Sequence, residues 1–183
     1  MELIKEGKLI LEKDWVNNIN ILEKEVKEVI KGKEKAVKIV KSDFVKAVND
    51  SFPDEKFGIL FSGGIDSTLI AFLAKKAGKD FVCYSVGLKR SDELKGADDL
   101  FWSKKIAKEY GFDLKVVELG VEGFEKIIEK VTKILGEPDV VKIGVGVALY
   151  PGMEKAKKDG LKYIYSGLGS EEIFAGYQRH EES

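Results

Sequence analysis

A glycine-rich turn between an apolar strand and a helix constrains this chain more than any other feature. Residues 57–61 form a short apolar run that is typical of a buried parallel strand. Ser62, Gly63 and Gly64 follow at once, and an amphipathic pattern over 67–78 predicts a helix. Because glycine has no Cβ, backbone N–H groups can approach an anion there, and the helix N-terminus adds partial positive charge. The sequence therefore predicts a phosphate-binding turn.

The polar side chains around the turn extend this prediction. Ser62, Ser67 and Thr68 carry hydroxyl groups that can donate hydrogen bonds to phosphate oxygens. Asp66 would repel a phosphate unless a cation lay between them, which indicates Mg²⁺. The alternative is a purely structural turn in which Asp66 or Ser67 caps the helix.

Strands alternate with helices along the rest of the chain. Further strands are expected at 81–86, 114–119 and 161–165, and further helices near 98–110, 123–135 and 147–159. This alternation predicts an α/β fold with a parallel sheet covered by helices. Ligands of such sheets bind at the carboxyl ends of the strands, where the glycine turn and the segment Ser85-Val86-Gly87 both lie. Gly144 and Gly146 lack the rest of a dinucleotide-binding motif.

The first 52 residues have a different pattern. Apolar residues recur at helical spacing between 19 and 30 and again over 38–48, so we expect a helical N-terminal extension of an α/β core at 53–183. At 183 residues, the two parts are expected to form one domain.

Composition limits the partners and the compartment. A net charge of −1 with interspersed Lys and Glu gives no electrostatic footprint for nucleic acid. The chain has no apolar run long enough to span a membrane and no signal-peptide pattern. Cys83 is the only cysteine, so disulfide frameworks are excluded and a cytoplasmic location is expected. Cys83 lies on a predicted strand and is interpreted as a core residue.

A second strand-to-loop segment near the C-terminus repeats the chemistry of the first. Tyr165 is followed by Ser166 and Gly167, which can approach a phosphate or a sugar, and then by Glu171, which could share a metal ion with Asp66. The alternative is a helix whose first turn is acidic because of the helix dipole.

These segments together resemble a known family. Residues 62–67, Ser-Gly-Gly-Ile-Asp-Ser, match the SGGxDS pyrophosphate loop of the N-type ATP pyrophosphatases. Residues 166–177 are similar to the SGEGSDEIFGGY motif of asparagine synthetases and their relatives, such as the β-lactam synthetases, and residues 85–88 resemble that family's AVGL. The resemblance runs from about residue 57 to residue 177. It implies a HUP-type (adenine nucleotide alpha hydrolase-like) fold that binds Mg-ATP.

The resemblance also implies site residues. Leu60 and Val86 are expected beside adenine, Ser166 and Gly167 near the ribose and α-phosphate, and Asp66 and Glu171 on Mg²⁺. The full set expected to contact the nucleotide is Leu60, Ser62, Gly63, Gly64, Asp66, Ser67, Val86, Gly87, Ser166 and Gly167. No catalytic residue is assigned.

In the family, a substrate carboxylate attacks the α-phosphorus of ATP, pyrophosphate leaves, and an amine displaces AMP from the acyl-adenylate. The resemblance thus implies an AMP-forming carbon–nitrogen ligase that acts on a small carboxylic acid. Leu168 stands where the asparagine synthetase motif has a glutamate implicated as general base, and an apolar side chain cannot accept a proton.

Besides Leu168, the chain differs from family members in two further ways, and both concern its extent. It has no N-terminal glutaminase, and it stops at Ser183 where family members continue. Either the chain is a fragment, or a partner or a second subunit completes the site. The alternative function is a nucleotide-binding or regulatory module that has lost amidation. A third, an N-type pyrophosphatase that modifies tRNA, is disfavoured by the neutral charge balance and the lone cysteine.

Overall fold

The computed structural model describes residues 4–5, 8–25, 30–89 and 98–174. The chain divides into two compact units, Met1–Phe44 and Val45–Ser183, which are described separately. The boundary falls within a helix, a few residues before the end of the predicted N-terminal extension. The expectation of a single domain stays a prediction.

The first unit is built from a short hairpin and helix. Strands β1 (Ile4–Lys5) and β2 (Lys8–Leu9) pair antiparallel and precede α1 (Glu12–Glu25). Helix α2 (Lys33–Ser51) begins in this unit and continues into the second. The predicted helical extension is confirmed by α1 and α2, although the part of the first pattern at 26–29 lies outside the described residues. The hairpin was not predicted, because two-residue strands leave no periodic pattern.

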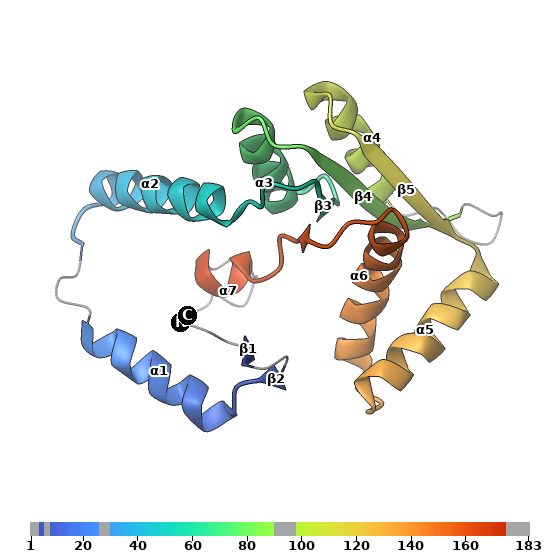
Figure 1. The fold of residues 1–183 in the computed structure, drawn as a ribbon, viewed down its shortest axis with the longest axis horizontal. Helices are drawn as coiled ribbons and strands as arrows, with labels where there is room; N and C mark the ends of the chain where they lie inside the picture. The colour runs from blue at the N-terminus through green and yellow to red at the C-terminus, as the bar shows by residue number, and fades with distance from the viewer. Residues whose placement is uncertain (1–3, 6–7, 26–29, 90–97, 175–183) are drawn as a thin grey trace. The chain divides into compact units, whose positions relative to one another are not determined.

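The second unit contains a four-stranded parallel sheet (Figure 1). The strand order is β5 (Leu114–Leu119), β4 (Phe81–Leu88), β3 (Phe57–Leu60), β6 (Ile164–Tyr165). The connecting helices are α3 (Ile65–Lys76), α4 (Asp98–Tyr110), α5 (Val121–Leu135) and α6 (Val140–Lys158), and α7 (Ser170–Phe174) follows the last strand. The predicted α/β class with a parallel sheet is confirmed.

Several boundaries differ from the sequence-based prediction, among them those of β6 and α6. Strand β6 has two residues in place of the expected five. Helix α6 begins at Val140, seven residues before the predicted start, because the Asp139 carboxylate accepts a hydrogen bond of 3.0 Å from the Lys142 amide and caps it. Gly144 and Gly146 therefore lie inside a helix, and a Cβ at Gly146 would come within 2.6 Å of a Val131 methyl on α5.

The two faces of the sheet are covered by different helices. On one face Gly87 of β4 approaches Leu100 of α4, and on the other Gly152 of α6 approaches Leu60 of β3. Burial raises the pKa of the Cys83 thiol to about 12, and its side chain is fully buried, so it is a core residue as predicted. Among the described helices, none has the length and apolar character needed to cross a membrane.

Candidate functional site

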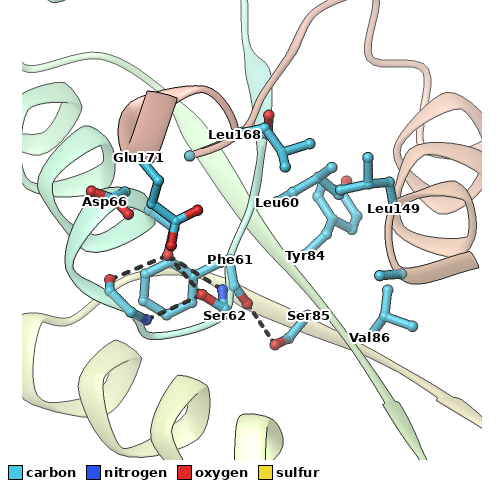
Figure 2. A pocket seen from close by; sticks show the side chains of 15 residues that line it. Leu60, Phe61, Ser62, Asp66, Tyr84, Ser85, Val86, Leu149, Leu168 and Glu171 are labelled. Carbon is cyan, nitrogen blue, oxygen red and sulfur yellow. Dashed lines mark hydrogen bonds between the residues drawn. The ribbon is translucent and has the colours of Figure 1, made fainter. Parts of the chain in front are cut away.

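A pocket of about 280 Å³ opens at the carboxyl ends of β3 and β4 (Figure 2). The fold brings most of the predicted nucleotide-binding and metal-binding residues to its wall. They are Leu60, Ser62, Gly64, Asp66, Ser67, Val86, Ser166, Gly167 and Glu171. Asp66 and Glu171 lie at one end of the pocket, and Val86 and Leu149 lie at the other. The site thus has a polar end and an apolar end.

Gly63 holds the turn against a neighbouring helix and is not part of the pocket wall. Its φ is +79°, in the left-handed region, and an added Cβ would lie 2.7 Å from the Ser103 amide nitrogen of α4. Ser103 is itself fully buried, and its hydroxyl donates to the Leu100 carbonyl at 3.2 Å. Because the clash would be with backbone, glycine at this position is a packing requirement as well as a conformational one.

The N-terminus of α3 is open toward the pocket. The backbone amides in the first turn of a helix have no intrahelical acceptor. The N-cap of α3 is Gly64, which has no side chain that could accept a hydrogen bond from them. The turn is held by its own hydroxyls: the Gly64 amide donates to Ser62 Oγ at 3.2 Å, and the Ser62 amide donates to Ser67 Oγ at 3.3 Å. Neither Asp66 nor Ser67 caps α3, which argues against the purely structural alternative.

The loop after β6 packs closely onto this helix N-terminus. An added Cβ at Gly167 would lie 2.8 Å from Asp66 Cβ and 3.2 Å from the Ser67 amide nitrogen. The Ser170 hydroxyl donates to the Gly167 carbonyl at 3.0 Å and ties the start of α7 to the loop. This contact places Glu171 in the same pocket as Asp66.

Asp66 and Glu171 are the residues of this pocket that could hold a magnesium ion together with a phosphate. Mg²⁺ is usually held by one or two carboxylates together with substrate phosphates and water. Over the described ranges, no group of three or more His, Cys, Asp or Glu side chains is gathered. Asp66 and Glu171 are therefore a sufficient protein donor set only where a phosphate supplies further oxygens.

The apolar end of the pocket includes residues that the sequence did not single out. Tyr84, Ala148 and Leu149 line it with Leu60 and Val86. Tyr84 lies two residues before Val86 on the same face of β4, so the period of the strand could have indicated it. Ala148 and Leu149 come from α6, and no local pattern marks them.

A network of charged groups fixes Tyr84. Its hydroxyl donates to Asp159 Oδ2 at 2.8 Å, and Lys115 Nζ donates to the same oxygen at 2.7 Å. Lys155 binds the other carboxylate oxygen. Burial, followed by the hydrogen bond to Asp159, raises the pKa of the Tyr84 hydroxyl, which stays protonated. The network joins β4 and β5 to the C-terminal end of α6.

The structure also shows where Gly87 and Leu168 lie relative to the pocket. Gly87 lies outside this pocket, and a Cβ there would come within 2.4 Å of Leu100 Cγ on α4. Leu168 lines the pocket with 59% of its surface exposed. The motif residue Tyr177 lies outside the described part of the chain.

Comparison with known proteins finds asparagine synthetases among the relatives of this chain. One is a candidate glutamine-hydrolyzing asparagine synthetase 1 from Methanocaldococcus jannaschii, 40% identical over 127 residues, covering 69% of this chain and 22% of the relative. The nodule asparagine synthetase of Pisum sativum, also glutamine-hydrolyzing, is 33% identical over 150 residues and covers 76% and 25%. The chain thus spans about a quarter of the length of these relatives.

A solved structure supports the fold. The NH3-dependent NAD synthetase from Campylobacter jejuni superposes with a TM-score of 0.51 at 20% identity, covering 76% of this chain and 59% of that one. The asparagine synthase family profile matches residues 40–183, which include the whole pocket. The chain therefore belongs to the asparagine synthase family.

Proposed function

We propose that this chain binds Mg-ATP and adenylates a small carboxylic acid, releasing pyrophosphate, as the synthetase part of an AMP-forming ligase. The observation that carries the proposal is the pocket itself. An uncapped helix N-terminus and two carboxylates lie at one end, and apolar side chains from β3, β4 and α6 form the other. A nucleoside triphosphate has this same division between an anionic and an aromatic end.

In this proposal each group of residues has a physical role. The amides of the first turn of α3 and the Ser62 and Ser67 hydroxyls bind the β- and γ-phosphates. Ser166 and Gly167 lie beside the ribose and α-phosphate, and adenine lies between Leu60 and Val86. Asp66 and Glu171 would hold Mg²⁺, which neutralises charge on the pyrophosphate leaving group when bound.

The chain's contribution to adenylation is then positioning. The polar end holds the triphosphate so that an acid carboxylate can approach the α-phosphorus opposite the leaving pyrophosphate. Leu168 on the pocket wall offers no proton acceptor for an amine. We therefore assign no base for the amide-forming step and propose that a partner subunit or a second copy completes it. The lone buried Cys83 is compatible with a reducing, cytoplasmic setting.

Calorimetric titration of Mg-ATP into the full chain tests the nucleotide site. We expect Asp66→Ala and Glu171→Ala each to weaken binding at least tenfold, about 1.4 kcal/mol. Glu129→Ala is the matched control, since it removes an exposed carboxylate on α5 that does not line the pocket. Failure of the wild-type chain to bind Mg-ATP, or equal binding by all variants, would contradict the proposal.

AMP release in the presence of a panel of carboxylic acids tests the chemistry. An acid that elicits equimolar AMP and pyrophosphate supports the ligase. Mg-ATP binding without AMP release from any acid favours the alternative, a nucleotide-binding or regulatory module, for which Leu168 in the pocket wall is the structural argument.

A further inference from the structure

Gly152 of α6 lies directly behind the apolar wall of the nucleotide pocket. It is buried and does not line the pocket itself. A Cβ built on it would lie 2.6 Å from Leu60 Cδ2, 3.4 Å from Val86 Cγ2 and 3.7 Å from Tyr84 Cβ. All three of these residues line the pocket (Figure 2). The bare backbone of α6 at Gly152 is therefore the surface against which the apolar wall packs.

The other glycines of α6 have different surroundings. A Cβ on Gly146 would lie 2.6 Å from a Val131 methyl of α5, and a Cβ on Gly144 would have no heavy atom within 4 Å. The backbone of Gly152 is helical, a conformation that any residue other than proline adopts easily, and glycine in a helix interior is unfavourable relative to alanine. Glycine at this position is thus explained by the close approach of the pocket wall and not by backbone conformation.

Leu60 is the wall residue that an added methyl group would displace. On its core side it packs against Val82, Tyr84 and Ala156, which are almost fully buried. Leu60 itself is partly exposed, and the pocket is the open space beside it. Because close-packed core side chains do not give way easily, a methyl group on Gly152 would push Leu60 into the pocket.

We propose that Gly152 is a positioning residue that sets the size of the apolar end and so gives the pocket its preference for a purine base over a pyrimidine. The inference rests on the proposed function, in which adenine lies between Leu60 and Val86. A purine fills more of this space than a single-ring pyrimidine does. Because Gly152 contacts the wall and not the ligand, a change there should affect affinity according to the size of the base and not through the phosphates.

Calorimetric titration of three probes into the full chain and into Gly152→Ala tests the proposal. The probes are the Mg²⁺ complexes of ATP, CTP and tripolyphosphate, which share a phosphate chain and differ in the base. In Gly152→Ala the Kd of Mg-ATP should rise about tenfold and that of Mg-CTP about twofold, because the overpacked end has less room for the larger base. The Kd of magnesium tripolyphosphate should not change. Equal weakening for all three probes, or an unchanged Mg-ATP Kd, would overturn the proposal.

Gly144→Ala is the matched control. It makes the same substitution in the same helix, with open space around the added methyl group, at a position that does not line the nucleotide pocket. Both substitutions raise helix propensity, so α6 should be kept in both variants. Gly144→Ala should leave the affinity for all three probes unchanged. An equal loss of Mg-ATP affinity in the two variants would overturn the role of Gly152.

Leu60→Val provides a compensating variant. Valine lacks the Cδ2 atom that a methyl group on Gly152 would meet, so the double variant removes the clash and keeps an apolar wall. We expect the double variant to bind Mg-ATP more tightly than Gly152→Ala does, because the two substitutions are coupled through one contact. Losses of affinity that simply add would overturn the route through Leu60.

Methyl NMR of the nucleotide-free chain separates this inference from the proposed function. In Gly152→Ala the methyl resonances of Leu60 and Val86 should shift, and that of Ile134, which is 63% exposed on α5, should not. Unmoved Leu60 methyls would overturn the positioning role. Shifted Leu60 methyls in a chain whose wild type binds no nucleotide would count against the proposed function and the base preference, while the positioning of the wall by Gly152 would stand.

Discussion

At the scale of single residues, Gly167 decides how closely the loop after β6 approaches the turn before α3. A methyl group there would lie 2.8 Å from Asp66 Cβ and 3.2 Å from the Ser67 amide nitrogen. We expect Gly167→Ala to weaken Mg-ATP binding at least tenfold, about 1.4 kcal/mol, because the loop and Asp66 must move apart. Calorimetry of the variant gives the measurement.

The control for this prediction is Gly120→Ala. Gly120 has an extended backbone and nothing within 4 Å of an added Cβ, and it does not line the pocket. The same methyl group should therefore have no effect on Mg-ATP affinity there. A Gly167→Ala chain that binds as tightly as wild type would show that the close approach is not needed for binding.

At the scale of elements, the C-terminal end of α6 is tied to the sheet by Asp159. Hydrogen bonds from Lys115, Lys155 and Tyr84 lower the pKa of its carboxyl below the ordinary range. Since the folded pKa is lower than the unfolded one, the carboxylate stabilises the fold above about pH 4 and loses this effect as pH falls below it. We expect Asp159→Asn to lower the Tm at pH 7, and the difference from wild type to narrow below pH 4.

Thermal unfolding of both chains between pH 7 and pH 3 checks this. Asp139→Asn is a useful comparison, because asparagine can still cap α6 and the ion pair of Asp139 with Lys142 is long, at 3.9 Å, and exposed. It should change the Tm little at either pH. A Tm difference for Asp159→Asn that stays constant with pH would contradict the linkage.

At the scale of the whole molecule, ligand binding should appear as stability. A ligand that binds only the folded chain stabilises it by about 2.7 kcal/mol at a hundred times its Kd. For a chain of this length, that is a rise of roughly 5 to 10 °C in Tm. We expect this rise with ATP and Mg²⁺ together, and a much smaller one with ATP and EDTA, because the phosphates would then face two uncompensated carboxylates. Differential scanning fluorimetry gives the values.

Each component alone provides the control. Mg²⁺ without ATP should raise the Tm little, since two carboxylates without phosphate oxygens form a weak site. An equal rise with ATP in EDTA would show that Asp66 and Glu171 do not act through a metal ion.

The sequence by itself determined the features that depend on neighbouring residues. The strand–glycine–helix turn at 62–67, the alternation that gives a parallel sheet, and the convergence of Asp66 and Glu171 on one pocket all follow from local patterns and from the rule that ligands bind at strand carboxyl ends. Hydrophobic period and glycine position are properties of short segments, so they can be read without coordinates.

Only the tertiary structure decided how the apolar walls are made. Ala148 and Leu149 enter the nucleotide pocket because α6 lies close to β3, where Gly152 leaves room for Leu60. Gly63 and Gly87, expected at the nucleotide, are the positions where α4 packs against the turn and the sheet. These contacts join residues that are far apart in the chain, and their geometry depends on the angle and depth at which each helix packs. No local pattern encodes that.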